Sequence, residues 1–127
     1  MESYGGSSEK PNATVDRLRE LAGDPAAASA EYALLLDSLT SDSESVREWA
    51  VAALEDCGSP PMDAIASLTG RLATVGEDQL YWTATLLGRL GPAAKSAVDA
   101  LRAAHARTPA GPIAKRVEWA LEKIGAG

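Results

Sequence analysis

The residue types that most often perform catalysis or bind metal ions are scarce in this sequence. Among 127 residues there is one cysteine, Cys57, and one histidine, His105. A single thiol cannot form an intramolecular disulfide or a cysteine-based zinc site, and a single imidazole leaves most metal sites and catalytic triads incomplete. The acidic residues of segment 44–56 most simply form a solvated face, because their spacing does not require two carboxylates to share a pocket. We therefore expect no enzymatic activity, no metal and no cofactor.

Large aromatic and basic side chains are the remaining candidates for a function. On a helical wheel, Trp49 and Trp82 take equivalent positions on the flank of the buried stripe of two successive helices, and Arg116 takes that position in a third. Tyr81 is predicted to point outward, and Trp119 is predicted to be the most exposed tryptophan. We expect these five residues to bind a partner, since aromatic residues are common at the centres of protein interfaces.

Two interpretations of the tryptophans stay open at this stage. Trp49 and Trp82 either contact a partner or pack over the adjacent helix as the rim of the core. Basic residues near Arg116 favour an acidic partner, although they also fit ordinary solubilising charge. Cys57 is expected to be a small buried hydrophobic residue, and His105 a boundary residue bonded to a carbonyl or water.

The overall composition favours helices over strands. The sequence has 25 Ala and 15 Leu against 6 Val, 3 Ile and no Phe. Its apolar runs are too short for a transmembrane span, and the polar first six residues do not resemble a signal peptide. We expect an all-α protein that is soluble and cytoplasmic.

An internal repeat of 33 residues organises the helices. One apolar triplet recurs at spacing i, i+3, i+7, as Tyr32, Leu35 and Leu39, then Ile65, Leu68 and Leu72, then Val98, Leu101 and His105. Each triplet predicts a first helix, and these first helices span 25–39, 61–74 and 92–107. Each is followed by a second helix, over 44–57, 77–90 and 112–124. The second helices end at glycines that tolerate a positive φ, Gly58, Gly91 and Gly125.

These helices define the predicted domain organisation. Residues 1–10 are expected to be a disordered tail, and residues 11–127 a single repeat domain. Within that domain we expect a cap helix followed by three repeats, over 12–22, 24–58, 59–91 and 92–125. The polar outer side of the cap helix is what the end of a stacked array requires.

The second helices carry a pattern that belongs to a known family. The first repeat has Val46-Arg47, Ala50, Ala53-Leu54 and Gly58, the second has Leu87 to Gly91, and the third has Ala120-Leu121 and Ile124-Gly125. This pattern, with the linker-like segment Gly91 to Val98, resembles the short bacterial type of HEAT repeat over about residues 24–127. In the second repeat Gln79-Leu80 replaces the Val-Arg of the pattern. The resemblance implies a right-handed α-solenoid of about three helical hairpins, in which Arg47 braces neighbouring turns through Asp42 or Glu44.

The family resemblance and the charge distribution together limit the function. Proteins of this family are mostly adaptors and scaffolds, and a few are bilin lyases or DNA glycosylases. The net charge is −6, divided as −9 over residues 1–63 and +3 over residues 64–127. An acidic total disfavours general nucleic-acid binding. We expect a protein-interaction scaffold that binds a protein or peptide on the concave face lined by the second helices. The alternatives are a second copy of the chain as partner, a HEAT-like enzyme, or nucleic-acid contact through the basic C-terminal half.

Overall fold

The computed structural model describes residues 14–73 and 76–125 and divides the chain into two compact units, Met1–Gly58 and Ser59–Gly127. Helices make up both units, and residues 14–73 and 76–125 contain no strand, which confirms the all-α prediction. The boundary between the units coincides with the end of the first predicted repeat. The predicted disorder of residues 1–10 and the start of the cap helix at residue 12 lie outside the described residues.

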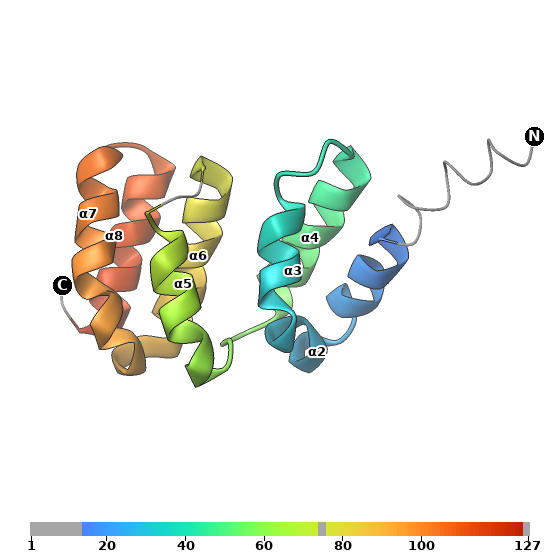
Figure 1. Ribbon diagram of the computed structural model, residues 1–127, viewed down its shortest axis with the longest axis horizontal. Helices are drawn as coiled ribbons and strands as arrows, with labels where there is room; N and C mark the ends of the chain where they lie inside the picture. Colours follow the sequence, from blue (N-terminus) through green and yellow to red (C-terminus); the bar gives the residue numbers. More distant parts are fainter. Residues whose placement is uncertain (1–13, 74–75, 126–127) are drawn as a thin grey trace, which may run out of the picture. The chain divides into compact units, whose positions relative to one another are not determined.

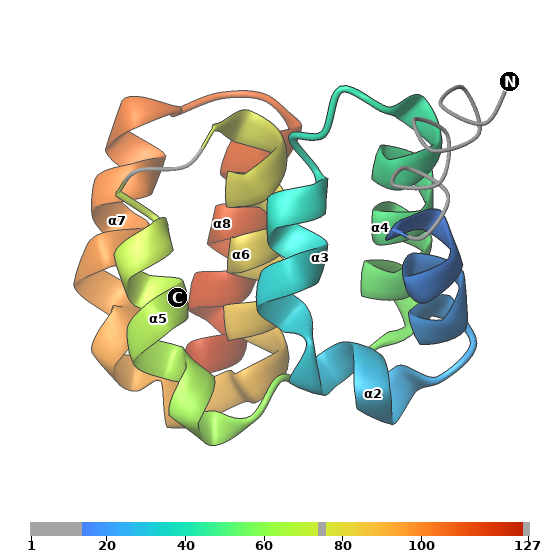
Figure 2. The ribbon, with the colours of Figure 1, turned by 45° about the vertical axis from the view of Figure 1, so that its right-hand side comes forward.

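The described part of the first unit contains helical residues 14–22, then α2 (Pro25–Ala30), α3 (Tyr32–Ser38) and α4 (Glu44–Asp56). Capping residues fix where α2 and α4 start: the Asp24 side chain accepts a hydrogen bond from the amide of Ala27, and the Ser43 side chain accepts one from the amide of Val46. Helices α2 and α3 both pack on α4 (Figure 2).

The predicted first helix 25–39 is interrupted at Glu31, between α2 and α3. The backbone there has φ −100° and ψ 30°, which is not helical. The Glu31 carboxylate accepts a 2.9 Å hydrogen bond from Arg17, which also pairs with Glu20. Its hydrogen bonds to Glu31 and Glu20 raise the pKa of the Arg17 guanidinium. Glutamate is a good helix former, so the local sequence gives no sign of this break.

The described residues of the second unit form four α-helices and two 3-10 segments. These elements are η1 (Met62–Ala64), α5 (Ile65–Arg71), α6 (Glu77–Leu90), η2 (Gly91–Ala97), α7 (Val98–Arg107) and α8 (Pro112–Ile124). The bounds of α6 and α8 match the predictions 77–90 and 112–124. The predicted helix 92–107 is a 3-10 segment followed by α7, and residue 74 of the predicted helix 61–74 lies outside the described residues.

The helices of this unit pack both within and between the predicted repeats. Helix α5 contacts α6 and α7 contacts α8, while α6 also contacts α8 and α5 contacts α7 (Figure 1). Arg107 at the end of α7 donates a 2.6 Å hydrogen bond to the Leu72 carbonyl after α5, and Ser59 donates to the Arg89 carbonyl in α6. These bonds satisfy carbonyl groups that helix ends leave without intrahelical partners.

The middle residues of the predicted core triplets are buried in both units, whereas the first residues, Tyr32, Ile65 and Val98, are half-buried. Leu35, Leu68 and Leu101 are all 0% exposed, as the repeated triplet requires. At the third position of the triplet, Leu39 and Leu72 are buried while His105 is half-buried. The glycines predicted to end the second helices, Gly58, Gly91 and Gly125, have φ of 73°, 64° and 98°. None of the described helices has the length and apolar character needed to cross a membrane.

A pair of buried threonines in α6 gives a first testable prediction. The Thr83 hydroxyl is buried and has no hydrogen-bond partner among the described residues, whereas the Thr85 hydroxyl donates to the Tyr81 carbonyl at 2.8 Å. Thr83→Val removes an unsatisfied hydroxyl and is expected to raise the free energy of unfolding by about 1 kcal/mol. Thr85→Val removes a satisfied hydroxyl, so it should give no such gain. Urea unfolding of both variants makes the comparison, and equal effects would contradict it.

Candidate partner-binding site

Helices α6 and α8 approach each other closely at Gly88. A β-carbon placed on Gly88 would lie 2.4 Å from Cζ3 of Trp119 and 3.1 Å from the α-carbon of Ala120. The indole of Trp119 therefore lies against the α6 backbone at this residue. Glycine within a helix costs up to about 1 kcal/mol relative to alanine, and Gly88 lies in the last turn of α6. The position of the Trp119 ring explains why that cost is tolerated here.

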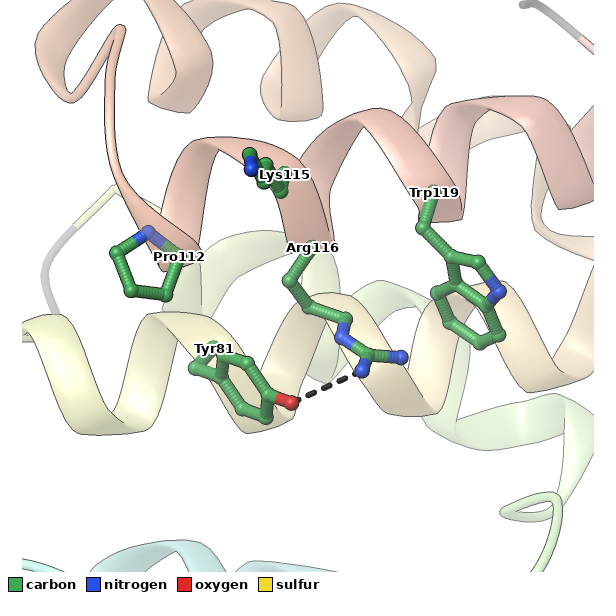
Figure 3. Close-up of a pocket in the computed structure, with 5 residues that line it drawn as sticks. All are labelled: Tyr81, Pro112, Lys115, Arg116 and Trp119. Atoms are coloured by element: carbon green, nitrogen blue, oxygen red, sulfur yellow. Dashed lines mark hydrogen bonds between the residues drawn. The ribbon is translucent and has the colours of Figure 1, made fainter.

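The anchored tryptophan positions Arg116, one turn earlier on α8. The guanidinium carbon of Arg116 lies 4.6 Å from the centroid of the Trp119 ring and 4.8 Å from that of the Tyr81 ring. Arg116 also donates a 2.9 Å hydrogen bond from Nη2 to the Tyr81 hydroxyl oxygen (Figure 3). Cation–π contacts and this hydrogen bond hold the guanidinium in place.

These side chains form part of the lining of a cavity of about 330 Å³, here called the Arg116 pocket. Its lining residues come from α6 and α8 and are Tyr81, Pro112, Lys115, Arg116 and Trp119 (Figure 3). The lining contains two cations and no carboxylate. Within residues 14–73 and 76–125, neither Lys115 nor Arg116 forms an ion pair.

The polar groups of the Arg116 pocket are mainly hydrogen-bond donors. Arginine and lysine donate only, and the Tyr81 oxygen already accepts from Arg116, which leaves its O–H proton for another acceptor. Helix α8 starts at Pro112 without a side-chain cap and without an acidic residue in its first turn. The pocket thus combines aromatic surface with positive charge, an environment that favours a ligand with acceptor oxygens.

The structure brings together three of the five residues selected from the sequence. Tyr81, Arg116 and Trp119 share one pocket. Trp82 is half-buried on α6 and does not line that pocket; its ring meets the Tyr81 ring edge-on, with centroids 5.3 Å apart. Trp49 belongs to the first unit, where the guanidinium carbon of Arg19 lies 5.4 Å from its ring centroid.

Three details of the sequence-based predictions are wrong. Trp119 is not an exposed tryptophan, because its half-buried ring packs on Gly88. Tyr81 is half-buried rather than outward, since Arg116 lies over its ring. Arg47 does not bond to a carboxylate: it donates a 2.6 Å hydrogen bond to the Ser41 carbonyl before α4. For the two aromatic residues the partner lies on the other helix of the pair, which a helical wheel does not contain.

Sequence reasoning also left two lining residues, Pro112 and Lys115, out of the candidate site. Lys115 is one of the basic residues near Arg116 that favour an acidic partner, but it does not share the wheel position of Arg116. The sequence feature that could have indicated this site is the i, i+3 pair Arg116 and Trp119, which places an arginine and an aromatic ring on one face of α8.

The single histidine and the single cysteine have structural partners. His105 Nε2 lies 2.7 Å from Glu118 Oε2, so its partner is a carboxylate on α8 rather than the predicted carbonyl or water. Both residues line a second cavity of about 300 Å³ with Arg102, Ala106 and Leu121. Cys57 is buried as predicted, with its sulfur 3.6 Å from the Leu54 carbonyl oxygen. No three His, Cys, Asp or Glu side chains of the described segments are arranged to hold a metal ion.

Comparison of the chain with protein-family models, with curated proteins and with solved structures finds no match. The candidate function therefore rests on the residues and geometry described above.

Proposed function

We propose that this protein is a non-enzymatic protein-interaction module, built as a short HEAT-like α-solenoid, which binds a partner protein or peptide on the face of its second helices. In the second unit those helices are α6 and α8. The Arg116 pocket is the binding site in the second unit, and Trp82 on α6 and Trp49 on α4 are each proposed to lie on the partner-binding side of the second helix of their own repeat.

The packing within the second unit supports the repeat interpretation. Stacked helical hairpins require each first helix to contact its own second helix and the first helix of the next repeat. The contacts of α5 with α6 and α7, and of α8 with α6 and α7, follow this scheme. The predicted 33-residue period agrees with the observed starts of α5 at Ile65 and α7 at Val98.

The pocket itself carries the binding proposal. Protein interfaces are enriched in tyrosine, tryptophan and arginine, which contribute most when they are rigid and centrally placed. Tyr81, Arg116 and Trp119 satisfy this description, because each ring contacts the guanidinium and Trp119 is held against Gly88. A prearranged pocket loses little side-chain entropy on binding.

Selection of peptides from a random display library tests this function. Peptides enriched on the wild-type protein should bind Arg116→Ala at least ~10-fold more weakly, since truncation of a central interface residue typically costs about 2 kcal/mol. Arg102→Ala, the same substitution on α7, should leave the affinity unchanged, because Arg102 lies outside the Arg116 pocket.

The circular dichroism spectra of both variants should remain those of the wild type. Failure to enrich any peptide, or equal binding by the Arg116→Ala protein, would contradict the proposed function.

A further inference from the structure

We propose that the Arg116 pocket recognises an acidic peptide, by binding a side-chain carboxylate between Arg116 and Lys115 while a neighbouring apolar side chain lies on Trp119. This inference rests on the proposed function and specifies the chemistry of the partner.

The charges that line the Arg116 pocket favour an anionic ligand group. Lys115 and Arg116 line the cavity without a carboxylate beside them. Glu77 and Asp78, in the first turn of α6, are exposed and neither lines the cavity. Among the described residues, no ion pair joins either one to Lys115 or Arg116. Two neighbouring cations repel each other, and one bound carboxylate would relieve that repulsion.

The hydrogen-bonding groups favour a carboxylate over a neutral acceptor. Arg116 uses Nη2 to bond Tyr81, and its other N–H groups still require acceptors. The Tyr81 O–H proton and the Lys115 ammonium add donors on the same cavity lining. Charge-assisted hydrogen bonds are roughly twice as strong as neutral ones, so a carboxylate gains more from this donor set than an amide of the same shape.

The partner is more consistent with an acidic peptide than with a nucleic acid. Binding to a phosphate backbone depends on many basic side chains acting together, and here two line the pocket of a chain with net charge −6. A cavity of about 330 Å³ is at the small end of ligand sites and fits one or two side chains. The aromatic rings provide the surface for the apolar neighbour.

The test uses four fluorescent probes and the full-length chain. Three peptide pools share randomised aromatic and aliphatic positions and differ only in a fixed residue, Glu, Gln or Lys. The fourth probe is a single-stranded oligonucleotide. The Glu pool should bind at least ~10-fold more tightly than the Gln pool, as expected for hydrogen bonds to a charged group. Its affinity should fall with added salt because the charges are near the surface.

Two charge-reversal variants on the same helix provide the matched comparison. Lys115→Glu should weaken binding of the Glu pool at least ~10-fold and shift the preference toward the Lys pool. Lys123→Glu makes the same charge change in the last turn of α8, outside the pocket lining, and should change binding less than ~2-fold. Both lysines are exposed, so both variants should keep the wild-type helical spectrum.

The remaining outcomes separate this inference from the proposed function. If the wild-type protein bound the Glu and Gln pools equally and Arg116→Ala bound neither pool, the proposed recognition of a carboxylate would be overturned. The proposed peptide-binding function would remain intact. Tighter binding of the oligonucleotide than of any peptide pool would overturn both the carboxylate proposal and the peptide-binding function, and would identify a nucleic acid as the partner. Equal effects of Lys115→Glu and Lys123→Glu would show a general charge effect and overturn the assignment to this pocket.

Discussion

Leu68→Ala is expected to lower the free energy of unfolding of the second unit by about 2–5 kcal/mol. Leu68 is the middle residue of the repeated triplet, lies on α5 and is completely buried. Truncation removes apolar contacts and leaves a cavity between packed helices, because the surrounding helices relax only in part. Urea unfolding followed by tryptophan fluorescence measures the change.

Leu90→Ala is the matched control for this substitution. Leu90 is the last residue of α6 and is half-buried, so the same truncation should cost clearly less. A loss below about 1 kcal/mol for Leu68→Ala, or an equal loss for the two variants, would contradict the assignment of the triplet leucines as the core.

Gly88→Ala is expected to destabilise the second unit by about 1–3 kcal/mol, as overpacking of a tight interface usually does. Intrinsic helix propensity predicts the opposite sign, a gain of about 1 kcal/mol from alanine within a helix. The added β-carbon would lie 2.4 Å from the Trp119 ring, so the ring or α8 must move. Thermal or urea unfolding decides between the two signs.

Two further variants identify the cause of the Gly88→Ala effect. Gly70→Ala in α5 places a β-carbon in open space and should be neutral or stabilising by up to ~1 kcal/mol. Trp119→Leu removes the clashing ring, so adding Gly88→Ala to that variant should cost much less than it does in the wild type. A destabilising effect that persists unchanged in the Trp119→Leu protein would show that the close approach is not its source.

The elements of the second unit could be predicted from the sequence because their signals are local. Glycines with positive φ end α6 and α8, and Pro112 begins α8, so the two helices start and stop where predicted. The first helices of the predicted repeats match their predicted ranges less closely. The break at Glu31 coincides with its bond to Arg17 from another helix, and 3-10 turns precede α5 and α7.

The geometry of the candidate site could be predicted only in part. A helical wheel gives the direction of a side chain around one axis, and it grouped Arg116 with Trp49 and Trp82, whereas the structure places Arg116 against Tyr81 and Trp119. The wheel does not contain the distance between two helices. Gly88 sets that distance at Trp119, and the resulting approach pairs Arg116 with Tyr81 rather than with Trp82. A glycine within the last turn of one helix, with a tryptophan on the next second helix, is the sequence signal that would have indicated this contact.

A charge-swap cycle on the Arg116 pocket tests the central proposal most directly. The affinity of one selected acidic peptide is measured for the wild-type and Lys115→Glu proteins, with the peptide glutamate kept or replaced by lysine. Each single swap should weaken binding at least ~10-fold, and the double swap should restore it to within ~3-fold of the original complex, because the two charges interact directly. Losses that simply add in the double swap would show that Lys115 and the peptide carboxylate do not meet, and would contradict the account of this pocket as an acidic-peptide site.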